Sequence, residues 1–229
     1  MRLTIATSYF PVDADIRRNL RYVLNHMRSG KKSGADVIHF PECALSGYAG
    51  ADFRSYKGFD WKTLEDATRE VLLESRRLGV WAILGSSHRL TGSHKPHNSL
   101  YIIDSRGDIV DRYDKMFCAG DRSGKEGDLA HYSPGDYFCT FRIKGVRCGT
   151  LICHEFRYPE LYREYRRKNV ELIFHSYHAG QWVHHPERIL LLAAGRRRRD
   201  YHHRRPDRPV APGAFRGLRL RRSLGREVA

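Results

Sequence analysis

Apolar residues follow two different periods along the chain, and the two periods predict helices and strands in alternation. In Asp13–Lys32 and again in Trp61–Leu78, apolar positions recur every three to four residues, which is the spacing of a helix with one buried face. Asp13 or Asp15 is suited to begin the first helix, and Gly34 to end it. Short apolar runs typical of buried strands occur at Arg2–Ser8, Asp36–Phe40 and Val80–Ser86.

The chain then continues with two predicted β-hairpins and further alternation. Residues Asp104–Asp108 separate one pair of apolar runs, and Lys144-Gly145 separates the other. Strands interleaved with helices are typical of an α/β domain whose helices pack outside a sheet. The remaining elements are expected at Ser99–Ile103, Ile109–Tyr113, Tyr137–Ile143, Val146–Ile152, Pro159–Lys168 (helix), Val170–His175 and Pro186–Ala194 (helix), with residues 114–136 mostly loop.

The positive charge of the chain is concentrated in its C-terminal segment. Residues 196–229 contain 12 Arg and three acidic residues and so carry +9 of the net +15, which leaves +6 for residues 1–195. The segment has no sustained apolar period and is built largely of Arg, Pro, Ala, Gly and His, so we expect it to bury no core. We predict that it is disordered or an out-of-frame translation, because a GC-rich gene read in the wrong frame yields many such codons.

Length and composition indicate one soluble globular domain. The 229 residues are 41% hydrophobic and 29% charged, and a chain of this length can bury a sizeable core. No apolar run approaches the ~20 residues needed to cross a bilayer, and the N-terminus lacks the apolar centre of a signal peptide. We therefore predict a cytoplasmic protein without a membrane partner. The five cysteines are an odd number without CxxC spacing, which argues against a disulfide framework or a zinc ribbon.

One cysteine stands where chemistry is expected. Cys153 directly follows the strand Val146–Ile152 and precedes a helix, and such a tight strand-to-helix turn presents a nucleophile at a sheet edge. Glu42 and Lys115 also follow predicted strands, so the three residues are expected to converge on one edge. A carboxylate can act as base toward the thiol, an ammonium can stabilise a tetrahedral intermediate, and the His154 backbone N–H can bind an oxyanion.

Three segments, in this order, resemble the signatures of the nitrilase superfamily, the carbon–nitrogen hydrolases. They are Phe40-Pro41-Glu42 with Leu45-Ser46-Gly47-Tyr48, then Tyr113-Asp114-Lys115, then the run GTLICHEFRYPE from Gly149 to Glu160. The resemblance covers about residues 1–190. It implies an α-β-β-α sandwich and cofactor-free hydrolysis of a nonpeptide carbon–nitrogen bond through a covalent acyl-enzyme.

The resemblance also implies roles for individual residues. Glu42 would be the general base, Lys115 would stabilise the intermediate and Cys153 would attack. Many members add a second glutamate in the loop after the lysine, and Glu126 is the plausible match.

Within the superfamily, the run CHEFRYPELYR looks closer to the amidase and carbamoylase branches than to true nitrilases, which tend to have Trp-Glu-Asn after the cysteine. The predicted substrate is therefore a small amide. Residues 1–195 would form the hydrolase domain, which we expect to be incomplete at its C-terminus because later family segments are missing. Family members often pair through their sheet layers, so a homo-oligomer is possible.

Several histidines follow one another near the end of the hydrolase region. Their spacing does not resemble HExxH, and no carboxylate or thiolate is suitably placed beside them, so we predict no metal site. Instead, Tyr177 and His178, together with Trp182, are expected to line a substrate pocket beyond the strand Val170–His175. The histidines are His175, His178, His184 and His185.

Two other classes of function stay open. A nucleic-acid-binding protein acting through residues 196–229 would bind with a steep dependence on salt. A hydrolase-like binding protein without activity would result if missing C-terminal strands left the site loose.

Overall fold

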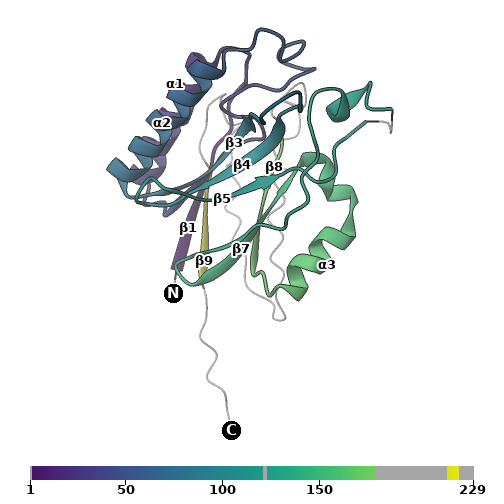
Figure 1. Cartoon of the computed structure of the whole chain (residues 1–229). Helices are drawn as coiled ribbons and strands as arrows, with labels where there is room; N and C mark the ends of the chain where they lie inside the picture. The colour runs from purple at the N-terminus through teal and green to yellow at the C-terminus, as the bar shows by residue number, and fades with distance from the viewer. Residues whose placement is uncertain (1, 121–122, 179–215, 222–229) are drawn as a thin grey trace, which may run out of the picture.

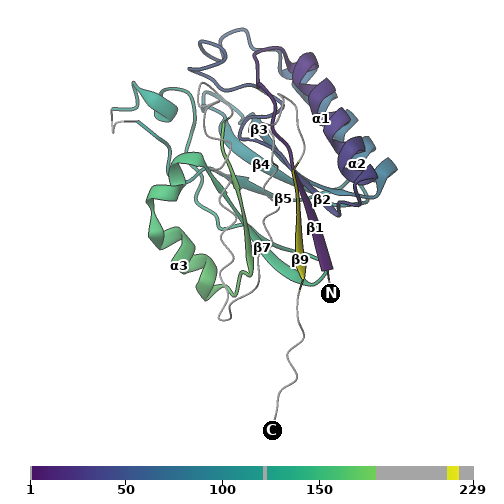
Figure 2. The ribbon, with the colours of Figure 1, turned by 180° about the vertical axis from the view of Figure 1, so that it is seen from behind.

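Two β-sheets lie face to face, and helices cover their outer faces (Figure 1). The computed structural model describes residues 2–120, 123–178 and, by backbone alone, 216–221. The larger sheet has the strand order β5-β4-β3-β2-β1-β9, and the smaller sheet has the order β6-β7-β8. Helices α1 and α2 pack on the larger sheet and α3 packs on the smaller one, which Figure 2 shows from behind. The predicted α-β-β-α sandwich is confirmed.

The strands and helices of the larger sheet come mainly from the first half of the chain. β1, β2 and β3 run parallel to one another, while β4 and β5 return antiparallel as a hairpin. The elements are β1 (Arg2–Thr7), α1 (Ile16–Lys32), β2 (Val37–His39), α2 (Trp61–Leu78), β3 (Trp81–His88), β4 (His97–Ile103) and β5 (Ile109–Asp114).

The smaller sheet and its helix follow. β6 and β7 form an antiparallel hairpin, and β8 adds to β7 in parallel. The elements are the 3₁₀ turn η1 (Gly127–Ala130), β6 (Thr140–Ile143), β7 (Val146–Ile152), the 3₁₀ turn η2 (Cys153–Arg157), α3 (Pro159–Arg167), β8 (Leu172–Ser176) and β9 (Arg216–Arg221).

The two long helices begin and end at the residues that their capping chemistry favours. The Asp15 side chain accepts a hydrogen bond from the backbone N–H of Arg18, and Asp60 does the same for Thr63. Such N-caps pair amide groups that the helix itself leaves free. α2 ends at Gly79, whose left-handed φ of 61° suits glycine. Of the two N-caps predicted for the first helix, Asp13 and Asp15, the structure uses Asp15, so the helix begins at Ile16.

Side chains of the larger sheet alternate between two apolar layers. In β1, Leu3 and Ile5 join the core between the sheets, whereas Ala6 joins the layer under α1 and α2. On the other side, α3 packs closely on β7 because Gly149 has no side chain. A Cβ at Gly149 would lie 2.5 Å from the ring of Tyr165, which cannot be accommodated without a shift.

The structure contains one strand that the sequence pattern did not predict. The backbone of β9 pairs antiparallel with β1, from Arg2 opposite Arg221 to Thr7 opposite Arg216. The prediction that residues 196–229 are disordered or out of frame and bury no core stays a prediction, because the structure describes 216–221 by backbone alone. Strand pairing uses backbone N–H and C=O groups, so it can occur without the apolar period on which the prediction relied. The rest of the segment lies outside the described residues, as does the helix predicted at 186–194.

Within the described part of the chain, no helix is both long enough and apolar enough to cross a membrane. The predicted cytoplasmic location, the pairing of copies and the out-of-frame origin of the C-terminal segment stay predictions.

Candidate active site

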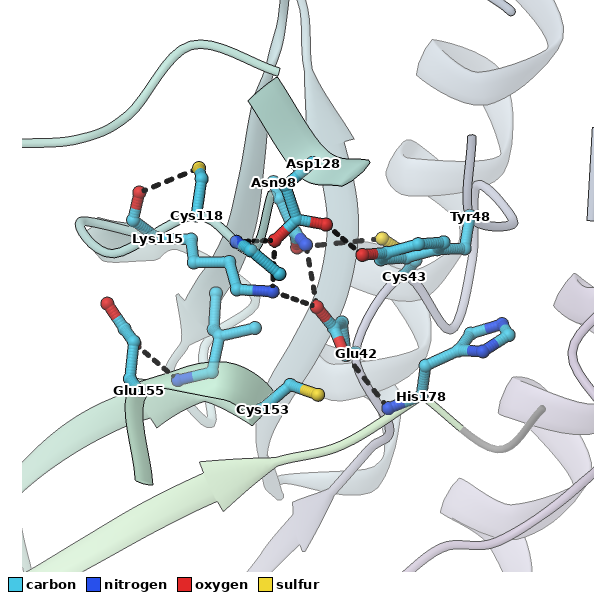
Figure 3. Close-up of polar contacts among 12 residues, drawn as sticks. Glu42, Cys43, Tyr48, Asn98, Lys115, Cys118, Asp128, Cys153, Glu155 and His178 are labelled. Atoms are coloured by element: carbon cyan, nitrogen blue, oxygen red, sulfur yellow. Dashed lines mark hydrogen bonds and ion pairs between the residues drawn. The ribbon is translucent and has the colours of Figure 1, made fainter. Parts of the chain in front are cut away.

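Three strands end at one rim of the sandwich, and each end carries one of the predicted catalytic residues. Glu42 lies three residues beyond β2, while Lys115 and Cys153 directly follow β5 and β7. The Lys115 ammonium donates a hydrogen bond to Glu42 Oε1 over 2.8 Å. Figure 3 shows the Cys153 side chain beside the same carboxylate. The fold therefore brings together three residues that are far apart in the sequence.

The Cys153 thiol is presented by a sharp change of backbone direction. β7 ends at Ile152, and Cys153, the first residue of the η2 turn, takes a left-handed φ of 43°. A non-glycine residue in this region is uncommon and is often found at functional sites. The prediction from the sequence placed Cys153 on such a turn, and the backbone has this geometry.

Polar groups on several sides hold the Glu42 carboxylate, which is fully buried. Oε1 accepts from Asn98 Nδ2 and Lys115 Nζ, each over 2.8 Å. Oε2 accepts from the backbone N–H of His178 over 3.0 Å, and the backbone N–H of Glu42 donates to the Tyr177 carbonyl over 3.1 Å. The carboxylate is thus fixed by β4, by the loop after β5 and by the end of β8.

The turn that carries Glu42 lies directly against β3. A Cβ at Gly85 would be 2.0 Å from the Pro41 carbonyl oxygen and 2.7 Å from the Cys43 backbone nitrogen. These distances are far below van der Waals contact, and both contacts are to backbone. Glycine at position 85 is therefore what allows the Glu42 turn to approach the sheet this closely.

Lys115 is a buried cation held between two carboxylates. Its Nζ lies 2.8 Å from Glu42 Oε1 and 2.7 Å from Asp128 Oδ2. Burial lowers the pKa of Lys115, but the charges of Glu42 and Asp128 outweigh burial and raise this pKa well above its usual value. Lys115 is therefore a permanent positive charge beside the thiol.

The Cys153 thiol is protonated in this environment. Burial raises the pKa of Cys153, the neighbouring Glu42 charge raises it further, and Lys115 lowers it only in part. A protonated thiol next to a carboxylate needs to lose its proton during attack, and Glu42 is placed to accept it.

Glu126, which we expected to be an accessory carboxylate, does not reach this cluster. Its side chain is exposed, whereas Asp128, two residues further along, is buried against Lys115. Asp128 Oδ2 also accepts from the backbone N–H of Ala119 over 2.8 Å, and its Oδ1 accepts from the Tyr48 hydroxyl. In the structure Asp128, and not Glu126, is the acidic residue of this loop that contacts Lys115, and an accessory catalytic role for either residue stays a prediction.

Two residues at the site were missed in the sequence. Asp128 was passed over because Glu126 matches the expected residue type and loop spacing varies. Asn98 could not be recognised from the sequence, because an asparagine near a strand end is ordinarily a polar residue without a catalytic role. In the structure Asn98 binds Glu42 through its side chain, and its carbonyl accepts from the Lys115 backbone N–H over 2.9 Å.

The predicted binding residues lie beside the cluster. His178 Nε2 contacts Asp52 Oδ2 over 2.8 Å, and its ring packs on Tyr48 with 4.9 Å between centroids. The Tyr177 hydroxyl lies 3.3 Å from His175 Nδ1. His154 follows Cys153 and its ring packs against Tyr158. Substrate contact by Tyr177 and His178 and oxyanion binding by the His154 N–H stay predictions.

The histidines considered for a metal have other contacts where they are described. His175 Nε2 lies 3.1 Å from the Cys153 carbonyl, and His178 contacts Asp52. Among the residues that the structure describes, no group of three or more His, Cys, Asp or Glu side chains is arranged to hold a metal ion. His184 and His185 lie outside those residues, as does Trp182.

The fold and the cluster define a layered α/β protein with a buried Glu-Lys pair beside a cysteine at a strand end. The family model described as carbon–nitrogen hydrolase matches residues 4–194, and the chain belongs to this family.

Curated relatives of known name cover a similar part of the chain. The chain is 26% identical over 166 residues to nitrilase homolog 2 of Dictyostelium discoideum, covering 69% of this chain and 48% of that protein. It is 28% identical over 148 residues to deaminated glutathione amidase of Yersinia enterocolitica, covering 62% and 51%. The chain thus spans about half the length of the curated relatives it matches.

Solved structures share the fold. An amidase from Nesterenkonia sp. superposes with a TM-score of 0.66 at 17% identity, covering 76% of this chain and 64% of that one. A variant of that amidase shows covalent addition of the acetamide moiety of fluoroacetamide at its active-site cysteine.

Proposed function

We propose that the protein hydrolyses a carbon–nitrogen bond of a small amide through a thioester on Cys153. The observation that carries the proposal is the buried contact of Lys115 with both Glu42 and Asp128 directly beside the Cys153 thiol. Burying three charges is costly, and such an arrangement is characteristic of sites that stabilise charge during a reaction.

The first half of the reaction forms the thioester. Glu42 takes the proton from the Cys153 thiol while the sulfur attacks the amide carbon, and the carbonyl oxygen becomes an oxyanion. Lys115 and the His154 backbone N–H stabilise this oxyanion. The intermediate then expels the nitrogen, which takes the proton back from Glu42 and leaves as ammonia or an amine.

The second half consumes water. Glu42 removes a proton from a water molecule as its oxygen attacks the thioester carbon, and a second tetrahedral intermediate forms. Its collapse breaks the carbon–sulfur bond, releases the carboxylic acid and returns the proton from Glu42 to the sulfur. Each cycle converts one amide and one water into one acid and one amine.

An amide is favoured over a nitrile for two reasons. The residues after Cys153 differ from the Trp-Glu-Asn run that true nitrilases tend to have. Several relatives carry amidase names, among them the 2-oxoglutaramate amidase of Bacillus subtilis, which is 26% identical over 144 residues. These similarities support amide hydrolysis, with N-carbamoyl compounds as the next class to test.

The proposal is tested by replacing Cys153 with Ala and with Ser. Both variants are expected to lose hydrolysis of a panel of short aliphatic amides, measured as ammonia released. The wild-type protein incubated with the same amides should gain the mass of the acyl group. Cys148→Ala is the matched control, because Cys148 is a buried thiol on β7, the strand that ends just before Cys153, and its Sγ donates to the Val146 carbonyl over 3.4 Å. Wild-type turnover in either Cys153 variant would exclude the mechanism.

A further inference from the structure

A second buried carboxylate, Glu155, lies beside the site without belonging to the charge cluster. Its side chain is fully buried, and four donors surround it. Oε1 accepts from the Tyr113 hydroxyl over 2.7 Å and from the backbone N–H groups of Met116 and Phe117 over 2.8 and 3.2 Å. Oε2 accepts from the backbone N–H of Ile152 over 2.6 Å (Figure 3).

These four donors come from two of the three strand ends that form the site. Tyr113, Met116 and Phe117 flank Lys115 on both sides, whereas Ile152 directly precedes Cys153. One carboxylate therefore ties the Lys115 loop to the nucleophile turn. The ring of Phe117 also packs on Tyr158, tilted by 30° with 4.1 Å between centroids, and so reinforces the same junction.

The arrangement requires a carboxylate rather than any polar side chain of similar shape. An ionised carboxylate is acceptor-only and can accept at both oxygens, whereas an amide has one accepting oxygen and one donating nitrogen. Glutamine at position 155 would place its NH₂ group against either the Ile152 N–H or the Met116 N–H. Burial raises the pKa of Glu155, and the hydrogen bonds from Ile152, Tyr113, Phe117 and Met116 oppose this effect.

We propose that Glu155 is a positioning residue that keeps the Cys153 nucleophile in register with Lys115. The inference rests on the proposed function, because Glu155 acts on the reaction only through those two groups. Cys153 has a left-handed backbone conformation that its surroundings must maintain, and the nearest restraint on its N-terminal side is the Ile152–Glu155 hydrogen bond. Release of that bond lets the turn relax and moves the sulfur away from Glu42 and Lys115.

The test compares Glu155→Gln with the wild-type full chain by two readouts. One is the rate at which iodoacetamide alkylates Cys153, followed by mass analysis of the peptide that contains it, which requires no amide substrate. The other is kcat and KM for the best amide of the panel. Because a displacement of about 1 Å can cost about 100-fold in rate, we expect kcat to fall by about that factor with KM little changed. Alkylation should slow by about tenfold, since deprotonation of the thiol depends on the same geometry.

Two control variants separate positioning from general stability. Glu74→Gln also removes a buried carboxylate, but on α2, where Glu74 binds Arg28 and Arg77. It is expected to lower the unfolding midpoint and to leave both readouts unchanged per folded molecule. Tyr113→Phe removes one of the four donors and should slow alkylation by about threefold, because three hydrogen bonds remain.

The outcomes are distinct. A folded Glu155→Gln protein with wild-type alkylation and kcat overturns the inference, as does a loss of both in proportion to unfolded protein. If Glu155→Gln does not fold, Tyr113→Phe decides, and unchanged alkylation overturns the inference. If the wild-type protein cleaves no amide but Cys153 alkylation is fast and depends on Glu155, the proposed function fails while the positioning role stands.

Discussion

Two of the three-charge clusters among the described residues differ sharply in how far their members are exposed to water. On the helical layer, Glu74 binds Arg28 and Arg77, whose side chains are 52% and 60% exposed. At the rim of the sandwich, Lys115 binds Glu42 and Asp128, and all three side chains are at most 1% exposed. The two clusters have similar distances but differ in their contact with water.

This difference in burial changes what each cluster can do. Ion pairs with exposed partners are screened by water and contribute little to stability. A buried ion pair must offset the free energy of removing both charges from water, so apolar residues often stabilise a fold better. Removing one partner of such a pair leaves an uncompensated buried charge. The cost of burying Lys115 with Glu42 and Asp128 supports the proposed role of their electrostatic field in the reaction, whereas the ion pairs of Glu74 with exposed arginines need no such role to account for them.

The largest effect is expected for Lys115→Met, which removes the centre of the buried cluster. Turnover should fall below detection, because the oxyanion loses its cation. Glu42 and Asp128 are left facing each other without a counter-charge, so the free energy of unfolding should drop by about 3–5 kcal/mol. Urea unfolding followed by circular dichroism measures this loss. A Lys115→Met variant as stable as the wild type would contradict the difference drawn between the two clusters, since it would mean that Lys115 does not compensate the charges of Glu42 and Asp128.

The next effect is expected for Asp128→Asn, which removes one charge and keeps the shape. Lys115 retains Glu42, so the protein should stay folded, and kcat should fall by about 10- to 100-fold through weaker charge stabilisation. Glu126→Gln is the matched control in the same loop, where the side chain is exposed. Steady-state kinetics of the two variants should differ by at least that factor. If Asp128→Asn and Glu126→Gln were equally active, Asp128 would have no role in catalysis.

A smaller effect, on the pH dependence of stability, is expected from His39 below the site. Burial, and then the nearby His175, lower the pKa of His39 from 6.5 to about 3. The unfolded chain therefore binds a proton that the folded chain does not between these two pH values. Stability then rises with pH across this window and is lost as pH falls, by about 1.4 kcal/mol per pH unit for this group.

The variant His39→Gln should remove this contribution, because glutamine keeps a donor toward Ser176 and does not titrate. Urea midpoints at pH 4.5, 5.5 and 6.5 should then change less steeply with pH than in the wild type. The exposed residue His94 supplies the control His94→Gln, which should keep the wild-type slope. An unchanged slope in His39→Gln would assign the acid sensitivity to other groups.

The smallest effect is expected for Glu74→Gln, which changes a buried carboxylate whose two arginine partners are exposed. Loss of its ion pairs with Arg28 and Arg77 should cost about 1 kcal/mol or less, and kcat should not change. Added salt should narrow the gap between variant and wild type. A loss as large as that of Lys115→Met would remove the distinction between the two clusters.

Local signals in the sequence predict most of the fold. The periodic stripe of Trp61–Leu78, with Asp60 before it and Gly79 after it, locates α2 at its observed bounds. The last strand of the small sheet is less well predicted, since β8 runs over Leu172–Ser176 rather than Val170–His175. Strand ends depend on pairing with neighbours, and that pairing is not local. β9 was missed because its alternation of Leu218 and Leu220 with arginines is too short to stand out from the Arg-rich segment around it.

Site residues can be predicted from the sequence where a reactive residue type closely follows a strand. They cannot be predicted where the conformation of a loop determines which side chain reaches the site. Glu42, Lys115 and Cys153 each follow an apolar strand, so their convergence can be expected from sequence. The position of Asp128 depends on the contact of Gly127 and Asp128 with Ala119. Gly127 adopts a φ of 62°, and the Asp128 backbone N–H donates to the Ala119 carbonyl over 2.6 Å, which turns Asp128 inward and leaves its neighbours outside.

Gly85 places a constraint on any effort to re-engineer this protein. The residue makes no contact with a substrate in the proposed mechanism, yet the turn bearing Glu42 occupies the space that its side chain would fill. In a library that varies position 85, every side chain larger than hydrogen would push the Glu42 turn away from β3 and so displace the general base of the proposed mechanism. Screening effort is better directed to the side chain of His178, because this residue holds Glu42 through its backbone N–H, whereas its ring packs on Tyr48 and contacts Asp52.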